Sequence, residues 1–207
     1  MKELLPLVVT LTVIAAVAGL ALALVYTVTE GPIAAAEREQ TLKAIRNVLP
    51  EFDENLLQSV MFGEDEQQRE IFIARVNGGD LVGVAFSSTS RNGYGGNLEV
   101  MVGIVPEGES HKVNRIEILR HVETPGLGTK IAEEKFKGQF NSVNYDNLTF
   151  AVDKDDPGSP GKPSIDSITG ATISSRAVTE AVQKGMDFFL ENLDKIFEAA
   201  QQAEGSQ

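Results

Sequence analysis

Residues 69–88 decide the fold of this chain. They read Arg69-Glu-Ile-Phe-Ile-Ala-Arg-Val76, then Asn77-Gly-Gly-Asp80, then Leu81-Val-Gly-Val-Ala-Phe-Ser-Ser88. The β-branched and aromatic residues of the two outer runs favour strands. The central Asn-Gly-Gly-Asp contains the residue types that adopt the backbone conformations of a hairpin turn. The two runs are therefore predicted to pair as an antiparallel β-hairpin.

A second hairpin is predicted downstream, where the strand-like runs 98–105 and 112–120 flank Pro106-Glu-Gly-Glu109. Two consecutive hairpins indicate an antiparallel sheet. Between them lies the glycine-dense loop Asn92-Gly-Tyr-Gly-Gly-Asn97. This loop is either a wide turn or a place where the backbone approaches a flat ligand, with Tyr94 beside it.

Helices are predicted around the sheet. Residues 33–49 have Leu42, Ile45 and Leu49 at helical spacing and precede Pro50, which suggests a spacer helix. A short helix over 129–140, a strand over 148–152 and a long amphipathic helix over 174–202 follow. Strands followed by helices predict an α+β domain.

The expected organisation is an anchor at 1–30, a juxtamembrane helix and connector at 31–68, the folded domain at 69–200 and a polar tail at 201–207.

The N-terminal segment is apolar, with no charged residue from Leu4 to Val28. As a helix that rises about 1.5 Å per residue it would be roughly 37 Å long, enough to cross a hydrocarbon core about 30 Å thick with some tilt. Tyr26 stands where an interfacial aromatic residue belongs, and Gly31-Pro32 is expected to end the helix. A single membrane span is predicted.

Two features of this segment leave alternatives open. Ala21-Leu-Ala23 resembles the cleavage site of a signal peptide, but the apolar run continues beyond it and is longer than a signal peptide requires. The positive-inside rule gives no clear topology, because Lys2 precedes the span while Arg38, Lys43 and Arg46 follow it.

The composition excludes several classes of function. The chain has no cysteine, which rules out disulfides, Fe–S clusters and cysteine-ligated zinc, and it has only two histidines. Its net charge of −12 disfavours nucleic-acid binding. The aspartates of the loop at 153–162 lack the ligand spacing of an EF-hand and are expected to be solvated. Any redox chemistry therefore requires a bound cofactor.

A candidate anion site precedes the last predicted helix. Thr169-Gly-Ala-Thr172 lies just before it, and Ser174 or Ser175 is a natural N-cap. Free backbone N–H groups and the positive end of the helix dipole favour a phosphate there, and one of the hydroxyl groups could be esterified. From the residues alone, an ordinary capped helix start is the simpler interpretation.

The stretch Asp166-Ser-Ile-Thr-Gly-Ala-Thr-Ile-Ser174 resembles the signature D-x-x-[ST]-G-A-[ST]-x-[ST], at which flavin transferases attach FMN. Gly93-Tyr-Gly-Gly96, Val100-Met-Val-Gly103 and His121-Val-Glu-Thr-Pro-Gly-Leu-Gly128 resemble the other marks of FMN-binding domains, in the same order. Together with the span they resemble the G subunits of the Rnf electron-transport complex, which are related to the C subunits of the sodium-translocating NADH:quinone oxidoreductase. The loop at 153–164 and the tail after Ala200 carry no such mark.

The resemblance implies that FMN is joined through its phosphate to the Thr172 hydroxyl by a separate flavin transferase. It implies no metal site and no catalytic residue in this chain, since Thr172 is an attachment point and not a nucleophile in turnover. Asp166 would serve in recognition or would orient the hydroxyl. The remaining cofactor-binding residues that it implies are Tyr94, Glu123, Thr124, Leu127, Gly128, Lys162, Thr169, Gly170, Ala171, Ser174 and Ser175.

The function that the resemblance implies is that of a membrane-anchored electron-transfer subunit with covalent FMN. It would belong to a cell-membrane oxidoreductase complex that couples electron flow between ferredoxin and NAD to Na⁺ or H⁺ translocation, with the soluble domain on the extracytoplasmic side. Other membrane and redox subunits would be its partners. The rival hypotheses are a free-standing extracytoplasmic covalent flavoprotein and a flavin-free, membrane-tethered binding module.

Overall fold

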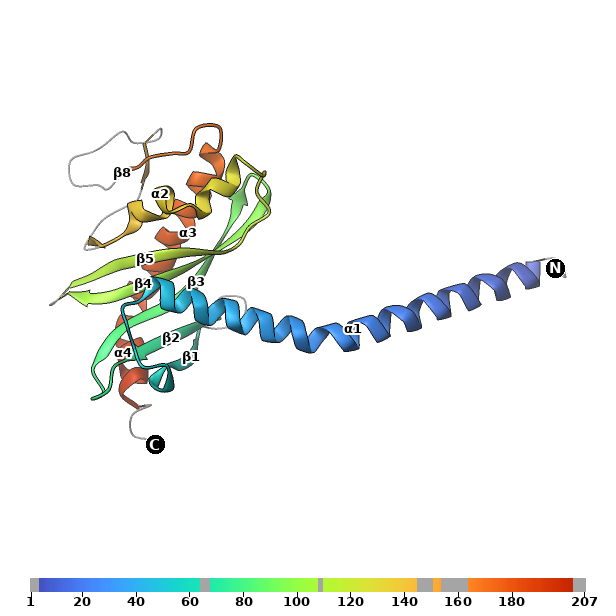
Figure 1. The fold of residues 1–207 in the computed structure, drawn as a ribbon, viewed down its shortest axis with the longest axis horizontal. Coiled ribbons are helices and arrows are strands. Elements are labelled where there is room, and N and C mark those ends of the chain that lie inside the picture. Colours follow the sequence, from blue (N-terminus) through green and yellow to red (C-terminus); the bar gives the residue numbers. More distant parts are fainter. Residues whose placement is uncertain (1–3, 64–67, 108–109, 145–150, 154–163, 203–207) are drawn as a thin grey trace. The chain divides into compact units, whose positions relative to one another are not determined.

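The computed structural model describes residues 4–63, 68–107, 110–144, 151–153 and 164–202 (Figure 1). The chain divides into two compact units, residues 1–42 and 43–207. The second unit begins well before residue 69, where the folded domain was predicted to start.

The N-terminal element is one continuous helix, α1 (Leu4–Val48), with Pro32 inside it. The prediction that Gly31-Pro32 ends a helix is therefore wrong. An interior proline costs on the order of 3 kcal/mol, but the run Ala34-Ala-Ala-Glu37 beyond it has high helix propensity and continues the helix.

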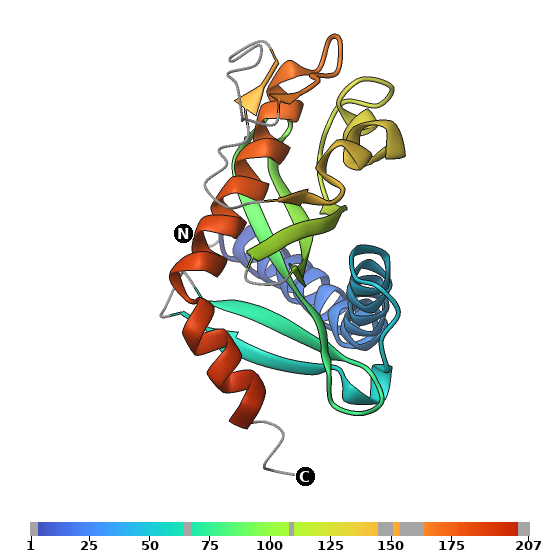
Figure 2. The same cartoon turned by 90° about the vertical axis from the view of Figure 1, so that its left-hand side faces the viewer.

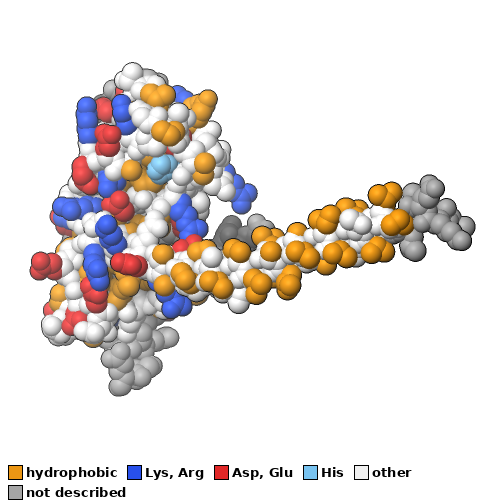
Figure 3. Space-filling view, turned by 45° about the vertical axis from the view of Figure 1, so that its right-hand side comes forward, with side chains coloured by type: hydrophobic (Ala, Val, Ile, Leu, Met, Phe, Trp, Pro, Cys, Tyr) orange, Lys and Arg blue, Asp and Glu red, His pale blue; other side chains and the backbone are white. Residues whose placement is uncertain are grey.

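The apolar part of α1 is exposed. An 18-residue window has a mean hydropathy of 2.7 and no buried residue, and Figure 3 shows hydrophobic side chains along this helix. Thr10, Thr12, Thr27 and Thr29 donate their hydroxyl groups to carbonyl oxygens four residues earlier, so these polar groups are satisfied within the helix. By length and composition, α1 is suited to cross a membrane.

The second unit contains a six-stranded antiparallel sheet whose strands follow their sequence order. The four strands that were predicted as two hairpins are present, and two edge strands that were not predicted are added. The strands are β1 (Gln58–Phe62), β2 (Arg69–Arg75), β3 (Leu81–Gly93), β4 (Gly96–Glu107), β5 (Ser110–Arg120) and β6 (Val143–Asn144).

The glycine-dense loop at 92–97 is the tip of a third hairpin. Gly93 pairs with Gly96, so β3 and β4 continue through most of the segment and leave only Tyr94 and Gly95 at the turn. Gly96 has φ +107°, which a glycine adopts without strain. The interpretation as a wide turn is therefore wrong.

Helices cover both faces of the sheet. α3 (Thr172–Glu191) and α4 (Leu193–Gln202) lie along one face, and the last turns of α1 lie on the other (Figure 2). Ala44, Ile45 and Val48 of α1 are buried there, so the end of the predicted spacer helix belongs to the core. The larger core is formed by alternate strand residues and the α3 face, including Ile71, Ile73, Val84, Phe86, Val100, Val102, Val178, Val182, Met186 and Phe189.

The other predicted helices differ in detail. The segment predicted as a helix over 129–140 is split into η3 (Gly128–Ala132), α2 (Glu134–Lys137) and η4 (Gly138–Phe140). The last predicted helix is interrupted at Asn192, whose side-chain amide donates to the Phe188 carbonyl oxygen at 2.9 Å.

The remaining elements are the 3-10 turn η1 (Glu54–Leu56) and the parallel pair of β7 (Ala151–Val152) with β8 (Ser164–Ile165). Lys162 and most of the predicted loop at 153–162 lie outside the described residues.

Candidate functional site

Three segments that are distant in the sequence meet at one end of the sheet: the β3–β4 hairpin tip, the loop after β5 and the start of α3 (Figures 1 and 2). They enclose a pocket of about 510 Å³. Its lining combines backbone, hydroxyl, carboxylate and apolar groups from Tyr94, Glu123, Thr124, Leu127, Gly128, Gly170, Ala171, Thr172, Ile173 and Ser174.

The floor of the pocket is the N-terminus of α3, where Thr172 is the first helical residue. Gly170 has φ +81° and turns the chain into the helix. The first N–H groups of a helix have no intrahelical acceptor, and they lie at the positive end of the helix dipole. The floor is therefore favourable for a phosphate group.

The expectation that Ser174 or Ser175 caps α3 is wrong. The residue at the cap position is Ala171, which makes no side-chain hydrogen bond. Ser175 is buried, accepts the Ile168 N–H at 3.0 Å and donates to the Ala171 carbonyl oxygen at 3.1 Å. Its hydroxyl thus holds the turn before the helix.

Ser174 joins the helix to the loop after β5. Its Oγ donates to Oε2 of Glu123 at 2.8 Å, and both side chains are buried. The other carboxylate oxygen, Oε1, is buried and has no hydrogen-bond partner among the described residues. A buried oxygen without a donor is costly, so Oε1 is an unsatisfied acceptor on a residue that lines this pocket.

Glycines make room for the Glu123 carboxylate. A Cβ atom on Gly128 would lie 2.6 Å from Oε2, and one on Gly93 would lie 2.7 Å from Oε1. A Cβ atom on Gly95 would collide with the carbonyl oxygen of Val122. The hairpin tip, the loop and the helix are therefore packed too closely around Glu123 to accept a side chain at these positions.

The loop is closed by local hydrogen bonds. The Leu127 and Thr129 N–H groups donate to the Thr124 carbonyl oxygen, and the Gly126 N–H donates to Thr129 Oγ1 at 3.0 Å. The upstream residue His121 accepts the Glu123 N–H on its Nδ1 at 3.3 Å. His121 therefore has a structural role just after the end of β5.

The rim of the pocket is apolar and exposed. Tyr94, Leu127 and Ile173 all line the pocket and keep 45 to 70% of their surface accessible. An apolar rim above a floor that favours anions suits a flat aromatic ligand that ends in a phosphate. Ile173 was not among the predicted site residues.

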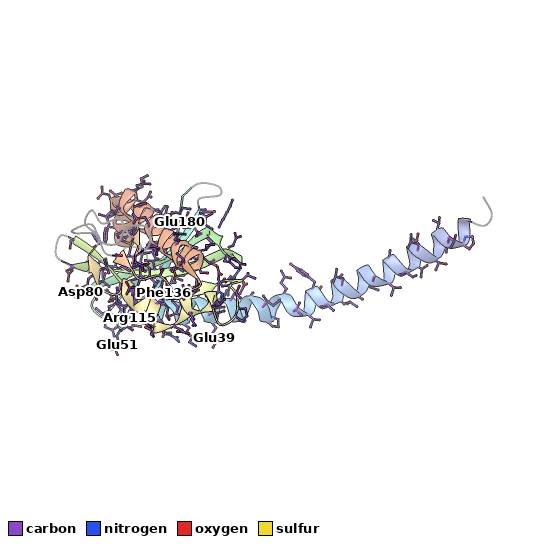
Figure 4. All side chains as sticks on the ribbon, turned by 90° about the horizontal axis from the view of Figure 1, so that it is seen from above. Glu39, Glu51, Asp80, Arg115, Phe136 and Glu180 are labelled. Carbon is purple, nitrogen blue, oxygen red and sulfur yellow. The ribbon has the colours of Figure 1, made fainter. Side chains whose placement is uncertain are left out.

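The hairpin tip is held by Glu180 of α3, labelled in Figure 4. Its carboxylate accepts hydrogen bonds from Ser90 Oγ at 2.7 Å and Asn92 Nδ2 at 2.8 Å, and Lys184 Nζ lies 2.6 Å from it. Burial opposes ionisation of Glu180, but the hydrogen bonds from Lys184, Ser90 and Asn92 outweigh it and lower the pKa. No sequence pattern indicates this long-range contact.

Asp166 and Thr169 are outside the pocket. They line a second cleft of about 590 Å³, together with Lys130, Lys135, Gln139 and neighbouring residues. The two clefts share no lining residue, and their linings adjoin in the chain between Thr169 and Gly170. Among the described residues, the predicted site residues are therefore distributed over two clefts, except Ser175, which is buried and lines neither of them.

Comparison with known proteins places this arrangement in a family. The FMN-binding domain family matches residues 93–187, from the hairpin tip through most of α3. The G subunit of the proton-translocating ferredoxin:NAD(+) oxidoreductase complex of Clostridium ljungdahlii is 31% identical over 177 residues, which cover 86% of each chain. The G subunit of the Na(+)-translocating ferredoxin:NAD(+) oxidoreductase complex of Acetobacterium woodii is 32% identical and covers 89% of this chain and 90% of its own.

A solved structure has a similar fold. The C subunit of the Na(+)-translocating NADH-quinone reductase of Parabacteroides distasonis superposes with a TM-score of 0.52 at 20% identity, over 75% of this chain and 89% of its own. By its relatives in sequence, this chain belongs to the family of G subunits of the ion-translocating oxidoreductase complexes.

Proposed function

We propose that this chain is the membrane-anchored electron-transfer subunit of an ion-translocating ferredoxin:NAD⁺ oxidoreductase complex, and that FMN is bonded to Thr172. The observation that carries the proposal is the pocket that unites Thr172 with the loop Glu123–Gly128 and with Tyr94. These segments are far apart in the sequence, and each was assigned to FMN by resemblance alone.

Different groups of the pocket suit the phosphate and the ring of FMN. The start of α3 offers N–H groups and a positive dipole end to the phosphate, and the unpartnered Glu123 Oε1 can accept a hydrogen bond from a hydroxyl or N–H group. The apolar rim of Tyr94, Leu127 and Ile173 can cover part of a flat ring. FMN, when bound, supplies electron transfer, and the chain supplies its position and electrostatic surroundings.

Attachment requires a flavin transferase that uses FAD. The Thr172 Oγ attacks the FMN phosphorus, so an ester bond forms and the bond that joins FMN to AMP breaks. AMP leaves with the bonding electrons, and the hydroxyl proton passes to the transferase or to solvent. A covalent link prevents loss of the cofactor, which suits a domain on the extracytoplasmic side, where free FMN is scarce.

Ion translocation is assigned to partner subunits. The apolar run Leu4–Val28 contains no ionisable residue other than Tyr26, so it offers no relay for Na⁺ or H⁺. The role of α1 is to anchor the FMN domain beside the membrane subunits.

The attachment is tested by expression of the full chain together with a flavin transferase, followed by denaturing electrophoresis and ultraviolet fluorescence. The wild-type band is expected to fluoresce, and Thr172→Ala is expected to be dark. A dark wild-type band would refute covalent flavin. Membership of the complex is tested separately, by co-purification of a multi-subunit membrane assembly with the tagged chain.

The sidedness of the domain can be tested because the chain has no cysteine. A cysteine introduced at the exposed turn residue Asp80 would be the sole thiol. A membrane-impermeant maleimide added to whole cells is expected to label Asp80→Cys. Labelling only after lysis would place the domain in the cytoplasm.

A further inference from the structure

We propose that Glu180 is a positioning residue of the FMN site, and that it holds the Tyr94 ring on the wall of the pocket, where the ring covers part of the flavin. The inference rests on the proposed attachment of FMN to Thr172. It adds a residue that lies outside the pocket and acts on the flavin only through Tyr94. The attachment point and this wall are then both set by one helix, α3.

The hairpin of β3 and β4 is irregular just before its tip. Regular pairing along β3 ends at Ser90 and resumes at Gly93. In this interval the two residues 91–92 of β3 stand opposite the single residue Asn97 of β4, which is the arrangement of a β-bulge. A bulge bends its strand and changes the direction of the side chains that follow it. The conformation of the bulge therefore influences where the Tyr94 side chain lies.

Glu180 clamps this bulge from the neighbouring helix. Its Oε2 accepts hydrogen bonds from Ser90 Oγ at 2.7 Å and from Asn92 Nδ2 at 2.8 Å. The buried Ser90 hydroxyl also accepts the Asn92 N–H at 3.1 Å. Lys184 Nζ lies 2.6 Å from Oε1 of Glu180, so both carboxylate oxygens have a partner. Side-chain hydrogen bonds thus hold the strand where the regular pairing is interrupted.

The helix that carries the clamp is itself fixed to the sheet on both sides of Glu180. At its start, Ser174 Oγ donates to the buried Glu123 carboxylate at 2.8 Å. Beyond Glu180, Gly185 allows α3 to lie close to β3, because a Cβ atom there would be 2.9 Å from Phe86 Cε2. A clamp on this helix therefore holds the hairpin tip at a defined place relative to the helix start.

Tyr94 follows the bulge, and its position is determined by its backbone. The glycines on either side of it are packed against the Glu123 carboxylate and the Val122 carbonyl group. The Tyr94 side chain lines the pocket, keeps 70% of its surface exposed and makes no hydrogen bond with any described residue. An aromatic ring on a fixed backbone is preorganised to stack on a flat ligand. Loss of the clamp should loosen this ring without removing any group from the pocket.

The clamp is tested first in the unloaded full chain, by hydrogen exchange of the amides of residues 92–96. Asn92→Ala removes an exposed donor to the carboxylate, and Glu180→Ala removes the acceptor. Both are expected to speed exchange roughly tenfold, the equivalent of about one lost hydrogen bond to a charged group. The amides of residues 77–80, in the turn between β2 and β3, should be unaffected. Glu191→Ala, which removes an exposed carboxylate at the end of α3, is the matched control.

The effect on the flavin is tested in full chains loaded by co-expression with a flavin transferase. An aromatic ring in contact with oxidised flavin quenches its fluorescence, so the fluorescence of each native chain is compared with that of the same sample after denaturation. Wild type and Glu191→Ala are expected to be quenched, whereas Tyr94→Leu, Asn92→Ala and Glu180→Ala are expected to lose quenching. Because Glu180 acts through Tyr94, Glu180→Ala should have no further effect when it is added to Tyr94→Leu.

The outcomes separate the clamp from the flavin. Exchange at the wild-type rate in both Asn92→Ala and Glu180→Ala would overturn the proposal. Full quenching in Tyr94→Leu would also overturn it, because the flavin would then lie away from the ring, and so would a further loss of quenching in the double variant. A wild-type chain that gains no covalent flavin would instead refute the proposed function, which the exchange measurement does not depend on.

Discussion

The two halves of the Asp166–Ser175 stretch are adjacent in sequence but differ in what holds them. In the first half the polar side chains of Asp166 and Thr169 are exposed and the backbone is bound by Gln139 and Asp153. In the second half, the hydroxyl groups of Ser174 and Ser175 are buried and bonded within the fold. The difference shows that the fold uses the hydroxyl groups of the second half in its own hydrogen bonds, whereas it leaves the Asp166 carboxylate and the Thr169 hydroxyl exposed.

The largest expected effect is at Thr172, the proposed attachment point. Thr172→Val keeps the shape of the side chain but removes the hydroxyl, so covalent flavin should be lost completely. Thr172→Ser keeps a hydroxyl at the same place and should remain loaded. In-gel fluorescence measures both, and fluorescence in Thr172→Val would show that the bond is elsewhere.

The second effect concerns the packing of the hairpin tip on the pocket. Gly95→Ala brings a Cβ atom into the Val122 carbonyl oxygen, so the backbone must shift, at a cost of about 1–3 kcal/mol. The melting temperature of the full chain in detergent should fall accordingly. Gly138→Ala is the control, because the nearest atom to its Cβ would be Asn141 Nδ2 at 3.8 Å. Equal melting temperatures for both variants would contradict the packing described here.

The third test compares the two halves directly. Ser174→Ala leaves the buried Glu123 carboxylate without its donor and should destabilise the chain by about 1–3 kcal/mol. Asp166→Ala and Thr169→Ala remove exposed side chains that make no bond to the described residues, and the change should stay within about 0.5 kcal/mol. Thermal or denaturant unfolding measures all three. A large loss of stability in Asp166→Ala would show that the first half is structural as well.

The smallest expected effect is a pH dependence from Glu180, which fixes the hairpin tip. Its pKa in the folded chain is lower than the ordinary value of 4.5, so its stabilising contribution is complete above that value. The contribution disappears as the pH falls through the folded-state pKa. The melting temperature of wild type should therefore fall more steeply below pH 4.5 than that of Glu180→Gln. If the melting temperatures of the two proteins fell in parallel with pH, the ionised Glu180 carboxylate would not stabilise the hairpin tip.

Local patterns predicted much of the fold and of the site. Four strands, the final amphipathic helix and nearly all pocket residues follow from turn residues, apolar periodicity and motif resemblance. The errors occurred where long-range contacts outweigh local preference. Ser174 looks like a helix cap in sequence, but its hydroxyl is taken by Glu123, 51 residues earlier.

The division of the site residues between two clefts could not be read from the sequence. Gln139 reaches Asp166 across 27 residues, and Glu180 reaches Ser90 across 90. Neither pairing has a spacing or composition signal, because each depends on how η4 and α3 pack against other elements. The error at Pro32 has a local cause. Proline disfavours a helix interior, but the helix-forming residues that follow Pro32 continue α1 through it.

The central claim is that Thr172 carries FMN, and mass spectrometry of the full chain after co-expression with a flavin transferase tests it most directly. The intact mass is expected to increase by one FMN less one water, and fragmentation is expected to place the added mass on Thr172. An unmodified mass, or an added mass on Thr169, Ser174 or Ser175, would contradict it.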